Sequence, residues 1–561
     1  MTCSAPAPAS PPKGWRPVSA TANATTALLT VRTAGIGTRV AEAARLRVPS
    51  ASTVVAKADT AAMTATRTAT IPVRAGRTYE VAKVVGFATS LDAANPAGRG
   101  TAGGGRRPRP RRHPGRERRA WARLWRSDIV VPGQPALQGR VRAAQFYLLA
   151  SARPDVDWNI SPVGLSAGGY HNHVFWDAET WMYPALLAQH PAEASTVVDY
   201  RYRTQAGARR NARRTGYGGQ RYAWESALTG DEVTPTWAET GRLEQHVTAD
   251  VALAQWQYYL TTGDQGWLRA RGWPVLRGAA DFWASRAERG DDGSYHINQV
   301  EGPDEQNWPV DDSVYTNATA KTTLELAARA AGRPGRPVPA RWTEVAGGLV
   351  VLESEPLGGL PAVRPEFRAY SGQQVKQADV MLLTYPWEFP QPAEVDRSNL
   401  DYYTPRYGPD GPAMTDSVNS IIAAELGIGC SAWTYTLRSL DPFVKAPYEQ
   451  FTEARSGQGV FTFLTGEGGF LREFLYGYTG LRWREDRLRL DPMLPPQLAT
   501  VSAGAPLTVP TRTAGPDDDN LARCRPVTAN AADPSAPAVA AVDGSTVTAW
   551  TPGPTRPPRA R

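Results

Sequence analysis

Carboxylates set in loops between aromatic and glycine residues are the first sign of chemistry in this chain. Asp304 and Glu305 follow Gly302 and Pro303, which interrupt the preceding segment and present the two acids on a loop. A carboxyl group beside another carboxylate holds its proton more tightly, which suits a general acid near neutral pH. The same pattern also fits an acidic turn that caps the next helix, so the acid role depends on the motifs around it.

A second loop acid lies further along the chain. Glu453 follows an aromatic-rich approach and precedes a glycine-rich run, in which Glu467 is a rival carboxylate. An acid here would also complement the dipole at the start of a helix. Cleavage of a glycosidic bond with inversion needs two carboxyl groups, one to protonate the leaving oxygen and one to activate water, about 6.5–9.5 Å apart. The sequence therefore offers candidates for such a pair.

Three further motifs carry hydrogen-bonding groups, and two of them pair such a group with a flat ring. Trp176–Asp177 in HNHVFWDAETWMYP (171–184) and Trp224–Glu225 in RYAWESALTGDE (221–232) each join a stacking face to an acceptor for hydroxyl groups. Lys376–Gln377 in VKQADVMLLTYP (375–386) offers donors for sugar hydroxyls. Each motif alone is also typical of a core segment or a helix surface.

The composition excludes several other classes of protein. The net charge is +8, but the tract RRPRPRRHPGRERR (106–119) alone carries eight Arg and one Glu, so the rest is nearly neutral. A Pro/Arg tract without aromatic residues is typical of a solvated linker, and we expect no nucleic-acid partner. The chain has no apolar run long enough for a membrane span. The first 30 residues hold no legible export signal.

The sequence predicts no metal site and no cofactor. Cys3, Cys430 and Cys524 lie too far apart for a metal knuckle or a disulfide scaffold. His171 and His173 have no cysteine or carboxylate beside them at metal-ligand spacing, so we expect a structural or substrate-facing role for them.

The elements that carry these motifs change in character along the 561 residues. Residues 120–480 show apolar positions at helical spacing, in many helices joined by motif-bearing loops, which favours paired helices closing into an (α/α) barrel. A helical solenoid is the alternative, but no repeat of fixed period is present. The other expected regions are a disordered N-terminus (1–25), a partial β-sandwich (26–92), a Gly/Arg/Pro linker (93–119), a C-terminal β segment (481–511) and a low-complexity tail (512–561).

Taken together and in this order, the five motifs resemble glycoside hydrolase family 65. The motifs are FWDAETWM, WESALTGDE, GPDE with VYTN, KQADV, and FTEAR with FLTGEGGFL. The resemblance implies a mainly α fold, with an N-terminal β-sandwich, an (α/α)6 barrel and a small C-terminal β-domain. It implies that Glu305 is the general acid, with Asp304 in support. The implied walls of the glucose site are Trp176, Asp177, Trp224, Glu225, Lys376 and Gln377.

The family contains hydrolases and phosphorylases, and the sequence favours a hydrolase. Phosphorylases of the family replace the catalytic base with a phosphate cradle of His and Ser residues. Here the corresponding stretch holds Glu453, which suits the base, and no His follows His296. An anion site built from Arg and backbone N–H groups remains an alternative.

The chain most resembles acid trehalase and its relatives, so we expect an inverting α-glucosidase that takes trehalose or another α-glucosyl disaccharide, such as kojibiose. The N-terminal β region is shorter than a full family sandwich, which leaves open a non-catalytic sugar-binding protein. A small carbohydrate is the expected partner. A degradative role favours secretion, although the sequence indicates neither the compartment nor the oligomeric state.

Overall fold

The computed structural model describes most of the chain. The described residues are 14–103, 113–154, 156, 158–165, 168–333, 335–457, 459, 462–498, 500–503, 508–510, 527, 529, 531–543 and 545–551. The chain divides into two compact units, Met1–Arg123 and Leu124–Arg561.

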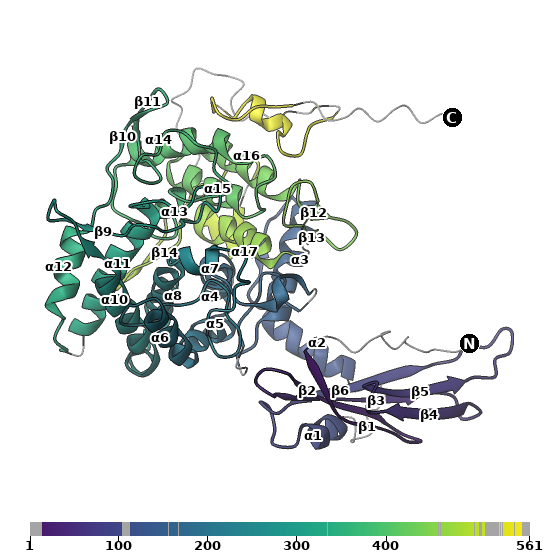
Figure 1. Cartoon of the computed structure of the whole chain (residues 1–561). Coiled ribbons are helices and arrows are strands. Elements are labelled where there is room, and N and C mark those ends of the chain that lie inside the picture. The colour runs from purple at the N-terminus through teal and green to yellow at the C-terminus, as the bar shows by residue number, and fades with distance from the viewer. Residues whose placement is uncertain are drawn as a thin grey trace. The chain divides into compact units, whose positions relative to one another are not determined.

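The first unit is built on an antiparallel sheet (Figure 1, purple). Its strand order is β1-β2-β3-β6, and a separate hairpin of β4 and β5 packs against β1 and β2. The strands are β1 (Trp15–Ala22), β2 (Ala27–Thr33), β3 (Arg39–Arg47), β4 (Thr53–Asp59), β5 (Thr64–Thr70) and β6 (Ala82–Thr89). The turn between β1 and β2 depends on Asn23, whose side-chain oxygen accepts the backbone N–H groups of Thr25 and Thr26.

Two regions of this unit differ from the sequence-based expectation. The N-terminus was expected to be disordered to residue 25, but β1 begins at Trp15 because its residues pair with β2. The range 93–119 was expected to hold no regular structure, yet it contains α1 (Pro96–Gly103) and the start of α2 (His113–Leu124). Helix α1 packs closely on β6, since a Cβ on Gly86 would lie 2.2 Å from the carbonyl oxygen of Gly100. Residues 104–112 lie outside the described part.

The second unit is mainly helical. Its helices are α3 (Pro135–Ser151), α4 (Tyr183–Gln189), α5 (Pro191–Arg203), α6 (Gln205–Arg214), α7 (Thr240–Leu243), α8 (Val247–Thr262), α9 (Gln265–Trp267), α10 (Trp273–Arg286), α11 (Val314–Gly332), α12 (Ala340–Gly348), α13 (Met381–Thr384), α14 (Ala393–Tyr403), α15 (Thr415–Glu425), α16 (Gly429–Leu440) and α17 (Leu464–Arg472). Three π-helical turns, Ala178–Met182, Leu268–Gly272 and Glu473–Tyr478, adjoin α4, α10 and α17.

Local signals in the sequence explain where several helices begin and end. Proline occupies the first turn of α3, α4, α5 and α10, where the missing N–H costs no hydrogen bond. Ser313 caps α11 by accepting the backbone N–H of Thr316. Gly263 ends α8 in the left-handed conformation, at φ 64°.

Contacts between distant segments join the ends of the helical unit (Figure 1). Helix α17 packs against α3 and against the turn Ala178–Met182, so the last helix lies beside the first. Helix α8 contacts α5, α10 and α11. A closed ring of helices needs such a contact between first and last elements, whereas an open solenoid does not.

Short strands complete the second unit. Hairpins form from β8 (Glu288–Arg289) and β9 (Tyr295–His296), β10 (Glu355–Leu357) and β11 (Leu360–Val363), β12 (Val444–Lys445) and β13 (Gln450–Phe451), and β14 (Arg482–Trp483) and β15 (Leu488–Arg489). A small sheet has the order β17-β16-β7, from Thr508–Pro510, Thr500–Ala503 and Ile129–Val130. Among the described residues, no helix is long and apolar enough to cross a membrane.

Part of the tail packs on the helical unit. The short helical turn Ala538–Ala541 contacts α16, and the hydroxyl of Thr434 donates to the buried carboxylate of Asp543 at 2.6 Å. Cys430, also on α16, is disulfide-bonded, although the sequence spacing indicated no disulfide scaffold. The hydrogen bond to Asp543 and the contact of Ala538–Ala541 with α16 order this part of the tail beyond what its low-complexity composition suggests.

Glycine packing between α17 and the turn Ala178–Met182 gives a test of the fold. A Cβ on Gly468 would lie 2.6 Å from the carbonyl oxygen of Trp181, so Gly468→Ala should destabilise the protein by about 1–3 kcal/mol. The matched control is Gly139→Ala on α3, where a Cβ meets nothing within 4 Å and should stabilise by about 0.5–1 kcal/mol. Thermal melts check both, and equal effects of the two substitutions would contradict the packing.

Candidate active site

The predicted site residues gather around one cavity of the helical unit, with a volume of about 430 Å³. Eight of the nine residues singled out from the sequence line it, namely Trp176, Asp177, Trp224, Glu225, Glu305, Lys376, Gln377 and Glu453. The remaining residue, Asp304, is buried beneath the lining. The volume suits a small ligand.

A second cavity, of about 290 Å³, fits less well as a site of acid–base chemistry. It is lined in part by Glu388 and Glu485, and both carboxylates form ion pairs with arginines. It contains none of the residues that the sequence singled out. The larger cavity is therefore the candidate active site.

A backbone bridge brings the two aromatic motifs together. Val174 and Ser226 pair antiparallel, with backbone hydrogen bonds of 2.8 and 2.9 Å, although they lie far apart in the sequence. The rings of Trp176 and Trp224 consequently lie side by side, with centroids 6.4 Å apart and planes tilted by 31°. Both rings are buried except for their cavity faces, so they form a stacking surface for a ligand.

A buried polar layer supports this aromatic surface. The ring of His246 packs edge-on against Trp176, with centroids 4.9 Å apart. Asp250 and Glu244 hold the two nitrogens of the imidazole, at 2.8 and 3.0 Å. The hydroxyl of Tyr315 in turn donates to Asp250 at 2.7 Å. These contacts hold the Trp176 ring in place. Tyr315 belongs to the VYTN motif, whereas the sequence singled out none of Glu244, His246 and Asp250.

Asp177 is a buried carboxylate of the cavity lining. The hydroxyl of Thr465, on α17, donates to its carboxylate at 2.6 Å. Burial raises the pKa of Asp177 to about 7, and the charges of Glu305 and Glu453 act in the same direction, while the bond from Thr465 opposes them. Near neutral pH this carboxyl group is therefore available both as a donor and as an acceptor.

Hydrogen bonds to other segments hold the loop that carries Glu305. Asp304 accepts the backbone N–H of Lys376 at 2.6 Å, which ties the two motif-bearing segments together. The backbone N–H of Asp304 donates to Asp379 at 3.1 Å. Glycine is required at position 302, because a Cβ there would lie 2.6 Å from the Asp379 carboxylate. Burial raises the pKa of Asp304.

Two donors converge on a single oxygen of Glu305. The Lys376 ammonium lies 2.9 Å from Oε1, and the side-chain amide of Gln377 donates to the same oxygen at 3.0 Å. Gln377 also donates to the carbonyl oxygen of Pro303 at 2.6 Å. Burial lowers the pKa of Lys376, but the charge of Glu305, its hydrogen bond, and the charges of Glu244 and Glu453 together raise it above its ordinary value. The pair holds the Glu305 side chain in one orientation.

Glu453, from the FTEAR motif, also lines the cavity. It follows β13, and the next residue, Ala454, pairs with Pro412, so its backbone is held on both sides. The hydroxyl of Tyr170 donates a short hydrogen bond to Oε1 of Glu453. Burial, together with the charge of Glu453, raises the pKa of Tyr170 far above its usual range, so the phenol keeps its proton.

Tyr170 lies in an unusual turn. Tyr170, His171 and Asn172 are consecutive and all adopt the left-handed conformation, with φ of 51°, 52° and 56°. Non-glycine residues rarely adopt this conformation, and such strain clusters at functional sites. The turn directs Tyr170 and His171 into the cavity lining.

Most other cavity residues were missed by the sequence analysis, although a structural or substrate-facing role was expected for His171. The additional lining residues are Pro162, Tyr170, His171, Phe175, Pro235, Trp237, Ala238, Thr240, Pro412, Met414 and Phe463. Trp237 is 84% exposed, which is unusual for an indole and marks the open side of the cavity. The position of Tyr170 directly before the HNH motif was a usable signal, whereas Trp237 lies in no motif. The rival carboxylate Glu467 is fully buried in α17 and does not line the cavity.

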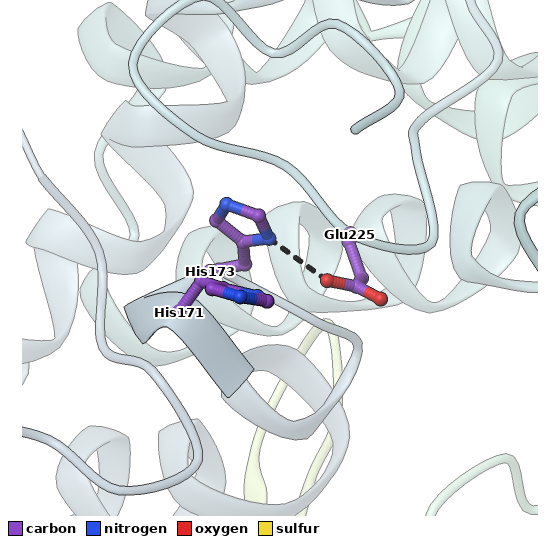
Figure 2. A group of neighbouring side chains, drawn as sticks. All are labelled: His171, His173 and Glu225. Carbon is purple, nitrogen blue, oxygen red and sulfur yellow. Dashed lines mark hydrogen bonds and ion pairs between the residues drawn. The ribbon is translucent and has the colours of Figure 1, made fainter. Parts of the chain in front are cut away.

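One histidine of the HNH motif, His173, has a carboxylate partner in the fold. Nδ1 of His173 lies 2.8 Å from the carboxylate of Glu225 (Figure 2). The local sequence offered no such partner, because Glu225 lies 52 residues further along the chain. The fold thus assembles a group of potential metal ligands that spacing in the sequence could not reveal.

Comparisons with known proteins agree on one family. Residues 142–341 match the "Glycosyl hydrolase family 65 central catalytic domain", and residues 8–106 match the N-terminal domain of the same family. In overall fold the chain is similar to a protein described as a kojibiose phosphorylase from the human microbiome. The TM-score is 0.66 at 17% identity, covering 87% of this chain and 71% of that one.

Curated relatives carry several glucosidase names. The chain is 39% identical to the kojibiose hydrolase of Mucilaginibacter mallensis, over 65% of this chain and 53% of that protein. It is 39% identical to the protein-glucosylgalactosylhydroxylysine glucosidase of Danio rerio, over 68% and 60%. It is 33% identical to the periplasmic acid trehalase of Saccharomyces cerevisiae, over 65% and 32%. The matched part thus spans between a third and three fifths of these relatives.

The pKa of Asp177 gives a test of the site's electrostatics. Between about pH 4 and 7 the folded protein retains a proton that the unfolded chain has lost, so stability falls as the pH rises through this window, by up to about 4 kcal/mol. Asp177→Asn removes this group, and its melting temperature relative to the parent protein should therefore rise from pH 4 to pH 8.

Asp231→Asn is the matched control. Its hydrogen bond with Arg210 lowers the pKa of Asp231 to about 2, so its contribution is constant above about pH 4. The same pH trend in both variants would contradict the account of Asp177.

Proposed function

The chain belongs to glycosyl hydrolase family 65, and on this basis we propose that it is an inverting, exo-acting glycoside hydrolase that releases glucose from an α-linked glucoside. We further propose that its helices form an (α/α)6 barrel with the cavity at one end. The contact of α17 with α3 supports a closed ring.

The observation that carries this proposal is the position of Glu305 and Glu453 on the lining of one cavity. In the proposed reaction the Glu305 carboxyl group donates its proton to the glycosidic oxygen as the bond to the anomeric carbon breaks. Glu453 removes a proton from a water molecule, whose oxygen bonds to the anomeric carbon from the opposite face. The products are glucose of inverted configuration and the free alcohol.

The surrounding residues have complementary roles in this scheme. Trp176 and Trp224 stack on the glucosyl ring, while Asp177 and Glu225 accept its hydroxyl groups. Because Lys376 and Gln377 both contact Oε1 of Glu305, the second oxygen, Oε2, is the one assigned to carry the transferred proton.

A phosphorylase of the same family is the second candidate, and the charges in the cavity count against it. The described lining contains four carboxylates, from Asp177, Glu225, Glu305 and Glu453, but a single ammonium group, from Lys376. Arg455, the arginine nearest to Glu453 in sequence, forms an ion pair of 2.6 Å with Asp416. A negatively charged cavity repels phosphate and stabilises the positive charge that develops on the sugar during hydrolysis.

The sequence alone favoured trehalose as the substrate. We now propose kojibiose ahead of trehalose. The relatives named kojibiose hydrolase and protein-glucosylgalactosylhydroxylysine glucosidase are 39% identical to this chain, compared with 33% for acid trehalase. The exposed ring of Trp237 on the open side suits contact with the leaving group.

Substitution of the two acids tests the proposed roles. Glu305→Gln and Glu453→Gln should each reduce kcat by at least about 100-fold, because each removes one proton-transfer step. Glu449→Gln is the matched control, since Glu449 lies near Glu453 in the sequence but contacts Arg140 instead of the cavity. Circular dichroism spectra of the two active-site variants should match that of the parent protein, which verifies that both variants fold. Full turnover in either of them would overturn the role of that residue.

Glucose release from kojibiose, trehalose, nigerose and maltose, with and without phosphate, tests the reaction class. We expect release without phosphate, with the highest kcat/KM on kojibiose. Release that requires phosphate, with glucose 1-phosphate as product, would instead make the protein a phosphorylase. A protein that melts cooperatively but cleaves none of these sugars would support the non-catalytic alternative.

A further inference from the structure

His171, His173 and Glu225 form a compact group at the edge of the cavity (Figure 2). One ligand atom from each lies within 4.8 Å of the other two. His173 Nδ1 and Glu225 Oε2 are 2.8 Å apart, and the two imidazole rings have centroids 5.5 Å apart with planes tilted by 39°. Within the part of the chain that the structure describes, this group combines nitrogen and oxygen donors suited to one cation.

We propose that these three side chains bind a divalent first-row transition metal ion, with Zn²⁺ as the representative, and that the bound ion inhibits the enzyme by blocking its sugar cavity. Two imidazoles and one carboxylate are a ligand set that zinc takes in proteins, with remaining positions filled by water or substrate. The inhibitory part of this inference rests on the proposed glycosidase function, whereas the binding part does not.

The fold fixes two of the ligands through the bridge between Val174 and Ser226. In an antiparallel pairing of these residues, His173 and Glu225 are diagonal neighbours on the same face. Diagonal neighbours lie close enough for long side chains to meet. The 2.8 Å contact is consistent with this geometry, and the two atoms need to separate by only about 0.6 Å to bind one zinc ion.

The third ligand must move slightly to complete the site. Ligand atoms around a tetrahedral zinc ion lie roughly 3.4 Å apart, which follows from Zn–N distances of about 2.0–2.1 Å. The present spread of up to 4.8 Å therefore requires a shift of His171 toward the other two ligands. His171 is exposed on its left-handed turn, so rotation of its side chain can supply this shift without disturbing the core.

Charge and position connect the metal site to the sugar site. Asp177, Glu305 and Glu453 line the same cavity and make it attractive to a cation, although Lys376 opposes them. His171 and Glu225 belong to the lining as well. A metal ion bound to Glu225 would occupy the oxygen atoms proposed for sugar hydroxyls, so metal and glucose should compete.

Calorimetric titration of the chelator-stripped full chain with ZnCl₂ tests the site directly. We expect one ion per chain, with binding weakened when saturating glucose is present. His171→Ala and His173→Ala should each reduce zinc affinity by at least about tenfold, by analogy with the effect of altering residues around a metal. His296→Gln is the matched control, because His296 is an imidazole outside the cavity lining that is held by Asp312, and it should bind zinc as the parent does.

The absorption spectrum of the Co²⁺-loaded protein gives a readout independent of activity. Visible bands that disappear in His171→Ala would support coordination by this group. No zinc binding, or equal binding by both histidine variants and the parent, would overturn the proposal. Thermal melts verify that the variants fold. If His173→Ala does not fold, His171→Gln at the exposed position provides a second variant.

The same samples separate this inference from the proposed function. Zinc binding by a protein that cleaves none of the sugars would support the site and count against the glycosidase. Phosphate-independent cleavage that 1:1 zinc binding leaves unaffected would overturn the inhibitory role.

Discussion

The contact between Lys376 and Glu305 is the interaction on which the candidate site depends. The described lining holds four carboxylates and only this one ammonium group, so the ion pair partly offsets the repulsion that gathering these acids creates. Uncompensated buried charges are costly, and the cost falls sharply when a partner and hydrogen bonds are present. The same pair also orients Glu305, because Gln377 approaches the same oxygen from the neighbouring position. Electrostatic balance and the orientation of Glu305 are thus provided by the same contact.

The fold serves this contact by joining loops from distant parts of the chain. Asp304 accepts the N–H of Lys376 and so binds the loop of Glu305 to that of its partner. The bridge between Val174 and Ser226 aligns the two tryptophan motifs, and Thr465 on α17 fixes Asp177. Each connection is a hydrogen bond made by backbone or by a buried side chain. The helices surround the cavity, and the candidate site residues lie in the segments between them.

Much of the site was predictable because its residues occur in pairs with a distinctive chemical combination. Trp–Asp, Trp–Glu and Lys–Gln pairs are visible in the sequence, and Glu305 and Glu453 lie in glycine-rich or aromatic surroundings. Residues that support the lining, such as His246, belong to no such pair in the sequence. His246 was not predictable because its role depends on packing against Trp176, which is distant in the sequence. Strand β1 was missed because the Ala/Pro/Thr-rich composition of this segment is typical of disorder. The strand is stabilised by its pairing with β2, which composition alone does not indicate.

The configuration of the first glucose released tests the central claim most directly. Proton NMR recorded during the early turnover of kojibiose distinguishes the two anomers before they equilibrate. If Glu305 acts as acid and Glu453 activates water across the glycosidic bond, β-glucose appears first and α-glucose follows only by mutarotation. Initial release of α-glucose would mean retention of configuration through a covalent intermediate, and it would contradict the assignment of Glu453 as a base.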